Sequence, residues 1–280
     1  MSLKQIRRRY RLYQRQREGR LRRRLFGTHV AGALMGAGDF VYAIDIEDQA
    51  VRPTARPYEP PVGGEIARVA QLIGPSDDVL VVGAHIGTVA IPVSRLCRAL
   101  WAIEANPRTF ALLEINLRLN DAKNVRAVNI AASDREEEVE FVLSRANSGG
   151  SKRMPQLRAP IYFYDDPEIV RLKARPLDDL FPDHSFSLVF MDIEGSEYAA
   201  LKGMQRILST ARALFVEFLP HHLRDVSGVT PEEFAGTIEP HFGELLIPSK
   251  NLRVRRPEFR QALRAMYDKN EGDAGLVFTR

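Results

Sequence analysis

Two segments of the chain end apolar stretches with residue types that bind nucleoside ligands. Residues 79–88 read Val-Leu-Val-Val-Gly-Ala-His-Ile-Gly-Thr, a strand-like run that ends in a glycine turn. Glu104 closes the next apolar run, 22 positions after Val82. Glycines let a backbone approach a ligand closely, and a carboxylate at a strand end can accept ribose hydroxyls. The pair predicts an adenosine-type cofactor at the carboxyl ends of two parallel strands.

The glycine spacing argues against the commonest cofactors of this type. A dinucleotide fingerprint needs G-x-G-x-x-G, but counting from Gly83 the chain has His85 and Thr88 at the second and third glycine positions. A pyrophosphate would meet the imidazole, and no G-x-x-x-x-G-K-[ST] loop occurs. The remaining pattern of Gly83, Gly87 and Glu104 suits S-adenosylmethionine, which has a ribose but no phosphate. An ordinary strand–turn–helix with an incidental glutamate is the alternative.

A second set of chemically capable residues follows the apolar run 186–192. Asp192, Glu194 and Glu197 place three carboxylates within six residues, and Glu217 ends a later apolar run. Such carboxylates could accept a proton, bind a metal or favour the start of the next helix. No other cluster of metal ligands accompanies them, so we expect no metal.

The elements that must position these residues alternate along the chain. Apolar runs predict strands at 40–46, 79–82, 99–104, 125–131, 139–143, 186–192, 213–218, 242–247 and 275–279. Helical patterns occupy 65–73, 86–97, 107–119, 196–208 and 231–238. Strands separated by helices of this length predict a mostly parallel sheet with right-handed crossovers. Residues 51–64 and 144–160 are expected to be loops, and residues 250–269 an inserted loop with a surface helix.

The composition favours a globular protein of the cytoplasm. A chain of 280 residues with 45% hydrophobic content can bury one full α/β core. No apolar run approaches the roughly 20 residues that a membrane-spanning helix needs. The single cysteine, Cys97, excludes an internal disulfide, which fits a reducing compartment.

The charge is concentrated near the N-terminus. Residues 4–24 hold eleven Lys or Arg and one acid, a balance of +10, so the rest of a chain of net charge +4 sums to −6. We divide the chain into a basic helical arm, 1–38, and a globular domain, 39–280. The arm could lie on an anionic membrane at its inner face or on a partner, or pack on the body or a second subunit of a homo-oligomer. A twin-arginine export signal at 22–38 is a third interpretation.

Residues 58 to about 219 resemble the FkbM family of S-adenosylmethionine-dependent methyltransferases. The matching segments are Tyr58-Glu-Pro60, Gly83-Ala-His-Ile-Gly87, Glu104-Ala-Asn-Pro107, Asn116 with Asn120, Asn129-Ile-Ala-Ala-Ser133, Pro176-Leu-Asp178, Met191-Asp-Ile-Glu-Gly-Ser-Glu197 and Phe215-Val-Glu217. The resemblance implies a class I (Rossmann-like) α/β fold, with a mostly parallel seven-stranded sheet and helices on both faces. It also implies S-adenosylmethionine as the cofactor and methylation of oxygen, often on a sugar or polyketide hydroxyl.

The resemblance also implies site residues, by position in this chain. Those expected to bind the cofactor are Glu59, Gly83, Ala84, His85, Gly87, Thr88, Glu104, Ala105, Asn106, Asn129, Ala131 and Asp192. Those expected to act in catalysis are Asp192, Glu194, Glu217 and His221. For the proton acceptor we prefer a carboxylate whose pKa is raised by burial, with His221 or His222 as alternatives. The family usually has aspartate where this chain has Val81 and asparagine where it has His85, so the methionine end of the cofactor is expected to meet altered side chains.

Three functions from different classes fit the sequence. The first is an O-methyltransferase that acts on a hydroxyl of a small molecule or glycan. The second is an RNA methyltransferase tethered by the basic arm. It is disfavoured because the chain has no Asn-Pro-Pro-Tyr-type motif and no aromatic-rich basic patch. The third is a non-catalytic S-adenosylmethionine-binding module, in which the altered glycine loop has abolished transfer.

Overall fold

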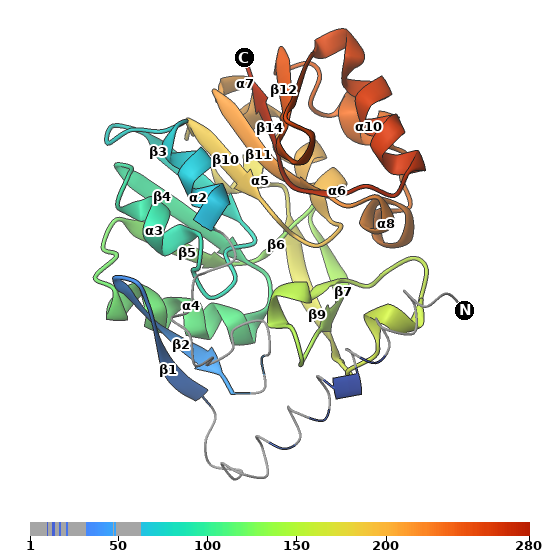
Figure 1. The fold of residues 1–280 in the computed structure, drawn as a ribbon. Helices are drawn as coiled ribbons and strands as arrows, with labels where there is room; N and C mark the ends of the chain where they lie inside the picture. Colours follow the sequence, from blue (N-terminus) through green and yellow to red (C-terminus); the bar gives the residue numbers. More distant parts are fainter. Residues whose placement is uncertain are drawn as a thin grey trace.

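The centre of the molecule is a mixed eight-stranded sheet, in the order β13-β12-β14-β11-β10-β3-β4-β5 (Figure 1). The computed structural model describes residues 10, 13, 14, 17, 21, 32–46, 48 and 63–280. The strands of this sheet are β3 (Asp78–Val82), β4 (Ala99–Glu104), β5 (Val125–Asn129), β10 (Leu188–Met191), β11 (Ala213–Phe218), β12 (Glu244–Ile247), β13 (Leu252–Arg255) and β14 (Asp273–Thr279). Strands β13 and β14 run against the other six. The expectation of seven strands was wrong, because residues 252–255, expected in the inserted loop, pair with β12.

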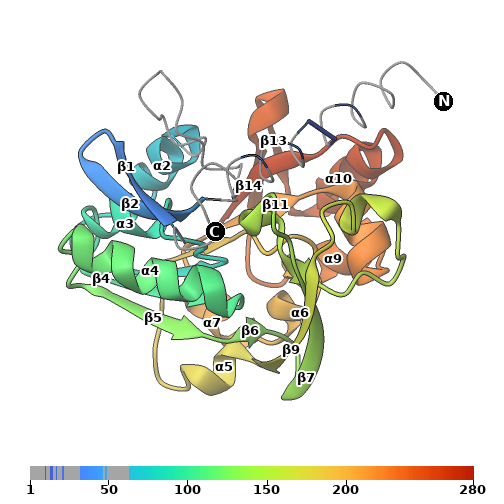
Figure 2. The same ribbon diagram turned by 90° about the horizontal axis from the view of Figure 1, so that it is seen from below.

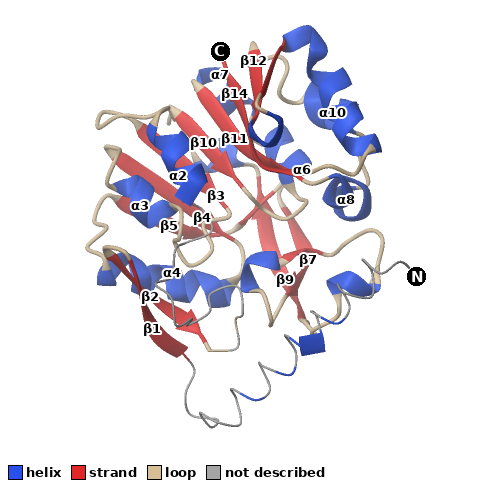
Figure 3. Cartoon of the chain, viewed as in Figure 1, coloured by secondary structure: helices blue, strands red, loops and turns tan. Residues whose placement is uncertain are grey.

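Helices cover both faces of this sheet, as Figure 3 shows. On one face lie α2 (Gly63–Ala70), α3 (Ala90–Ser94) and α4 (Pro107–Leu119); on the other lie α5 (Leu177–Leu180), α6 (Glu197–Lys202), α7 (Gln205–Thr210), α9 (Pro231–Gly236) and α10 (Phe259–Asp268). Alternate strand residues serve the two faces. Val79 and Val81 pack in the first apolar layer, and Leu80 and Val82 in the second. A strand buried on both sides therefore reads as the continuous apolar run seen in the sequence.

A smaller sheet stands beside the carboxyl ends of the main strands. It contains β6 (Ala131–Ala132), β9 (Glu168–Arg175), β7 (Glu137–Leu143) and β8 (Lys152–Arg153), in that order (Figure 2). Strand β9 was not predicted, although residues 168–175 alternate between apolar and charged side chains. Strand β8 lies within the expected loop 144–160. This sheet supplies one wall of the candidate site.

The described residues before α2 form a hairpin of β1 (Gly32–Ala37) and β2 (Phe40–Asp45). The prediction of a helical arm reaching residue 38 was therefore wrong for residues 32–37, where alternate side chains are buried. Asn116 and Asn120, one helical turn apart on α4, bond the free edge of β2. The Asn116 amide bonds the N–H and C=O of Ala43, and the Asn120 amide bonds those of Val41. The two amides thus take the place of a neighbouring strand.

Two predicted helices are shorter than expected because glycines interrupt them. Gly87 has φ +98°, which a right-handed helix does not allow, and α3 begins only at Ala90. The helix predicted over 196–208 divides into α6 and α7 at Gly203, where a Cβ would lie 1.9 Å from the carbonyl oxygen of Ser133. No described helix is long and apolar enough to cross a membrane.

Candidate active site

A cavity that is partly open to solvent lies at the carboxyl ends of β3, β4 and β10. Its apolar walls come from Ile103, Ile130, Val139 and Phe141, and Gly83 lies at its edge. The polar side chains that line it are those of His85, Glu104, Ser148, Ser151, Arg153, Asp192, Glu194 and Ser196. A largely apolar cavity with a few convergent polar groups is typical of a small-molecule site.

The glycine turn brings the ends of β3 and β10 into contact. Gly83 has φ +89°, and a Cβ there would lie 1.8 Å from the carbonyl oxygen of Asp192. The amides of Gly83 and Ala84 both donate to the carbonyl of Ile103 in β4, at 2.9 Å. Only glycine fits this approach. The turn is thereby held between the two strands whose ends carry the acidic residues.

Glu104 at the end of β4 is 8% exposed and accepts three hydrogen bonds from the protein. The His85 amide donates to Oε2 at 2.8 Å, whereas the Asn106 amide and the Thr109 hydroxyl donate to Oε1 at 2.8 and 3.0 Å. A carboxylate has about four acceptor positions. Glu104 therefore shapes the glycine turn and keeps one acceptor position for a ligand, where the sequence predicted two ribose contacts.

His85 joins the glycine turn to the loop that follows β7. Its backbone is left-handed at φ 52°, and its Nε2 lies 2.6 Å from the Ser148 hydroxyl. That hydroxyl also donates to the carboxylate of Asp48. The imidazole at the position of the family's asparagine therefore holds the cavity wall. Val81, the other departure, is fully buried in the core, so the expectation that it touches the cofactor was wrong.

Half of the residues expected to bind the cofactor line the cavity. They are Gly83, His85, Glu104, Ala105, Ala131 and Asp192. Glu59 lies outside the described residues. Of the expected catalytic residues, Asp192 and Glu194 line the cavity.

The other five, Ala84, Gly87, Thr88, Asn106 and Asn129, do not line it. Ala84 is 1% exposed and packs in the core, and Gly87 shapes the start of α3. Asn106 caps the first turn of α4 and donates to Ser151. The Asn129 amide ties β5 to the end of β4 by donating to backbone carbonyls. The amides of Asn106 and Asn129 already serve the fold, and the contacts of all five residues with the cofactor stay a prediction.

Four carboxylates gather at the ends of β10 and β11. Glu197, which begins α6, is 2% exposed, and its Oε1 accepts from the amides of Ile193 and Gly195. Glu194 sits in the intervening turn at φ 56°. The carboxylates of Asp192 and Glu217 accept no recorded hydrogen bond from any described residue. Backbone amides therefore hold Glu197, whereas Asp192 and Glu217 receive no such bonds from the described residues.

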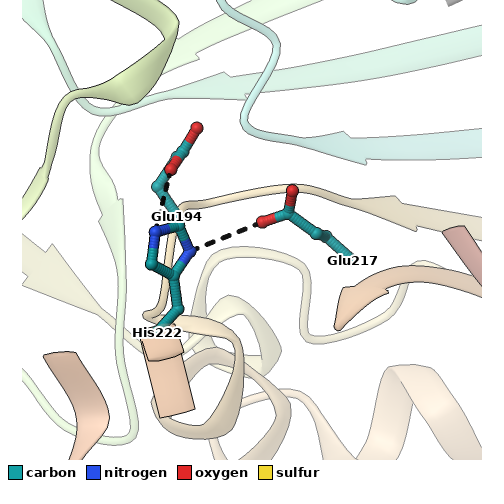
Figure 4. Close-up of side chains that lie close together, drawn as sticks. All are labelled: Glu194, Glu217 and His222. Atoms are coloured by element: carbon teal, nitrogen blue, oxygen red, sulfur yellow. Dashed lines mark ion pairs between the residues drawn. The ribbon is translucent and has the colours of Figure 1, made fainter. Parts of the chain in front are cut away.

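Lys152 and His222 complete this cluster. The sequence offered His222 as an alternative proton acceptor and did not point to Lys152. The Lys152 ammonium donates to Glu194 Oε2 at 2.9 Å and lies 3.3 Å from His222 Nε2. His222, in α8 (Pro220–His222), lies between Glu194 and Glu217, with ring nitrogens 3.4 and 3.7 Å from their carboxylates (Figure 4). Lys152 comes from a stretch expected to be a loop, and nothing local in the sequence marks it.

The candidacy of His221 was wrong in one respect, because it does not line the main cavity. It lines a second cavity with Tyr162, Arg224 and Asp225. Adjacent residues of a helical turn point in directions about 100° apart, so only one of the paired histidines could face the carboxylates. The sequence could not decide which.

Burial and mutual repulsion perturb the pKa values in this cluster. Burial, and then the charge of Glu194, raise the pKa of Asp192 well above its ordinary value. Burial, and then the charge of Asp192, do the same to the pKa of Glu217. Burial, reinforced by Lys152, lowers the pKa of His222 to about 2, so its imidazole is neutral. The ionised forms of Asp192 and Glu217 are therefore destabilised, and both carboxyl groups hold a proton more readily than exposed ones.

The comparisons with known proteins bear on this arrangement. The profile described as Methyltransferase FkbM domain matches residues 82–246, more than half of the chain. The chain belongs to the FkbM methyltransferase family. This membership confirms the resemblance and the implied cofactor, S-adenosylmethionine. A search of curated proteins gave no match.

Several solved structures resemble the chain weakly. An FkbM methyltransferase from Methylobacillus flagellatus KT has 21% identity and a TM-score of 0.43, over 72% of this chain and 43% of that one. A tRNA m1G37 methyltransferase of M. jannaschii has 16% identity and a TM-score of 0.36, over 68% and 45%. A precorrin-6y C5,15-methyltransferase from Geobacter metallireducens GS-15 has 15% identity and a TM-score of 0.42, over 77% of this chain and 84% of that one.

The chain spans less than half the length of the first two of these proteins. Scores this low support no transfer of substrate. The preference against nucleic acid as the acceptor therefore stays a prediction.

Proposed function

We propose that the chain is an S-adenosylmethionine-dependent O-methyltransferase that acts on a hydroxyl of a small molecule or glycan. The observation that carries this proposal is that one cavity joins the glycine turn and Glu104 to Asp192, a carboxyl with a raised pKa. The first pair suits the ribose end of the cofactor. Asp192 suits the removal of a proton from an alcohol. Family membership supports S-adenosylmethionine as the cofactor. The cavity residues support a cofactor near Glu104 and an acceptor hydroxyl near Asp192.

The described residues fit the cofactor. The cavity has apolar walls for an adenine ring and an acceptor position remaining on Glu104. When bound, the sulfonium of S-adenosylmethionine supplies an activated methyl group. The protein then has to align the acceptor and take up its proton.

Asp192 is the residue placed to accept that proton. It lines the cavity next to Gly83, and it accepts no recorded hydrogen bond from the described residues. A general base works best when its pKa is near the working pH, and burial moves Asp192 in that direction. Glu194 also lines the cavity, but its carboxylate is paired with Lys152.

Two measurements test the proposal. Calorimetric titration should show binding of S-adenosylmethionine and of its demethylated product in the low micromolar range or weaker, and no binding of NAD. Incubation with methyl-labelled cofactor and cell fractions should label a polar glycan or small-molecule fraction. Label in RNA would overturn the acceptor class. Cofactor binding without turnover on any fraction would favour a non-catalytic binding module.

A further inference from the structure

The cluster around His222 holds more negative charge than the described side chains neutralise. Four carboxylates meet there, those of Asp192, Glu194, Glu197 and Glu217. The ammonium of Lys152 is the cationic group recorded in contact with them among the described residues. Buried carboxylates at this density require protons or a further cation.

The buried imidazole of His222 has an unused nitrogen that points into this cluster. His222 is 4% exposed, and its Nδ1 has no hydrogen-bond partner within the part of the chain that the structure describes. Nδ1 lies 3.7 Å from Glu217 Oε2. Two ligands that each lie about 2.1 Å from one ion are roughly 3 to 4 Å apart. The pair therefore has the separation of two ligands of one cation.

We propose that Glu217 and His222 Nδ1 bind a divalent metal ion. Ligand atoms of Glu194, Glu217 and His222 lie within 4.8 Å of one another, as do those of Asp192, Glu197 and Glu217. Glu217 belongs to both groups.

The other nitrogen of His222 has a partner that suits this role. Glu194 Oε2 lies 3.4 Å from Nε2, and a carboxylate beside the distal nitrogen is the usual means of orienting a metal-bound histidine. Lys152 lies 3.3 Å from the same nitrogen. When the metal is bound to Nδ1, the proton of the His222 ring is on Nε2 and is donated to Glu194. The Lys152 ammonium then no longer donates to Nε2. The sequence predicted no metal because no further ligands accompany Asp192, Glu194 and Glu197 along the chain. The fold brings His222 to these carboxylates as a further ligand.

The donor set indicates the class of ion. A carboxylate favours Mg²⁺ or Mn²⁺, and an imidazole favours later divalent metals. Mn²⁺ accepts both kinds of ligand. The electron paramagnetic resonance signal of the free ion decreases when the ion binds to a protein, so bound Mn²⁺ can be counted. Titration of the full chain at pH 7.5 with Mn²⁺ should show one ion bound per chain.

Variants assign the binding to this cluster. His222→Gln and Glu217→Gln should each weaken Mn²⁺ binding by at least about tenfold, and Glu194→Gln by about 10- to 100-fold. His221→Gln is the matched control, because it alters the neighbouring histidine of α8 and should leave Mn²⁺ binding unchanged. Titration of each variant with S-adenosylhomocysteine shows that its cofactor cavity is intact.

Two results would overturn the metal site. The first is a folded wild-type chain that binds S-adenosylhomocysteine but no Mn²⁺, which would mean that protons neutralise the cluster. The second is Mn²⁺ binding that all three variants retain, which would place the ion elsewhere. Failure to bind S-adenosylhomocysteine would instead count against the proposed function, so the two failures are distinguishable.

Discussion

The two ends of the central sheet use buried carboxylates in opposite ways. At the amino end, Asp78 accepts two hydrogen bonds from Arg98, at 2.8 and 2.7 Å, and lies 3.0 Å from His184. The hydrogen bond from Arg98 holds the pKa of Asp78 below its ordinary value. Burial raises the pKa of the neighbouring Asp77, but bonds from Ser187, Gly74 and Arg212 outweigh it and lower that pKa. These carboxylates stay ionised and fasten loops to the sheet.

At the carboxyl end, Asp192 lines the cavity and Glu217 belongs to the same cluster of carboxylates. Burial and the neighbouring carboxylates raise the pKa values of both. Both ends have acids that follow or begin buried strands, so composition does not distinguish them. The difference is the supply of donors: among the described residues, arginines pair with Asp77 and Asp78 at the amino end, whereas Lys152 pairs with Glu194 at the carboxyl end. A carboxylate without a protein partner is costly unless a ligand, a proton or a metal completes it. We infer that one end serves stability and the other serves function.

Replacing Asp192 tests the functional end most strongly. Asp192→Asn should lower the rate of methyl transfer by about a hundredfold and leave S-adenosylhomocysteine affinity unchanged, because the amide keeps the shape but accepts no proton. Label transfer measures the rate, and calorimetry measures the affinity. Glu140→Gln, on the exposed side of β7, is the control. Activity within threefold of wild type would show that Asp192 is not the proton acceptor.

Replacing Asp78 tests the structural end. Asp78→Asn should lower the free energy of unfolding by about 2 kcal/mol, because it removes charge-assisted bonds at a buried position. The loss of stability is not larger because Arg98 is exposed, and solvent screens its attraction to Asp78. Urea denaturation measures it, with Asp121→Asn of an exposed ion pair as the control. Cofactor affinity should not change, and a loss of affinity would mean that the two ends are coupled.

Glu104 is the exception that sharpens the comparison, since it lies at the carboxyl end but is bonded by the protein. Glu104→Ala should weaken binding of S-adenosylhomocysteine by at least about tenfold, because it removes a charge-assisted bond to a ribose hydroxyl and releases the His85 amide. Calorimetry measures the change in affinity. Glu114→Ala, at an exposed position of α4, is the control. A loss below about threefold would contradict the ribose assignment.

The amino end also predicts how stability depends on pH. The folded-state pKa of Asp78 is lowered from 3.8, so its contribution is present above pH 3.8 and is lost as the pH falls through the folded-state value. The free energy of unfolding should decrease in acid below about pH 4, and Asp78→Asn should show a smaller decrease. Urea titrations at pH 3 and pH 6 provide the test. Parallel curves for the two proteins would exclude Asp78 as the source.

The smallest expected effect concerns the basic segment 4–24. Deletion of residues 1–24 should leave cofactor affinity and the melting temperature unchanged, because the glycine turn and both acidic strand ends lie downstream. It should weaken binding to anionic vesicles in a salt-dependent way. A truncated chain that no longer folds would show that the segment is packed structure.

Local patterns were sufficient for much of the framework. The bounds of α4 and β11 agree with those predicted, since proline begins the helix and apolar residues make up most of the strand. Patterns failed where tertiary contacts override them. The helix predicted over 196–208 divides at Gly203, where the carbonyl of Ser133, 70 positions away in the sequence, leaves room only for glycine. Asn116 and Asn120 matched the family pattern, but only the fold showed that they bond the edge of β2.

The sequence by itself determined the family, the cofactor and the positions of Gly83, Glu104 and Asp192. Each of these depends on a strand and the turn directly after it, and such short segments carry their own signal. The tertiary structure alone decided that Lys152 and His222 join the carboxylates. Lys152 is 42 positions from Glu194 and 70 from His222. Their proximity, and the pKa shifts that burial causes, arise only when separate strands and loops pack together, because no local pattern encodes the burial of a charge.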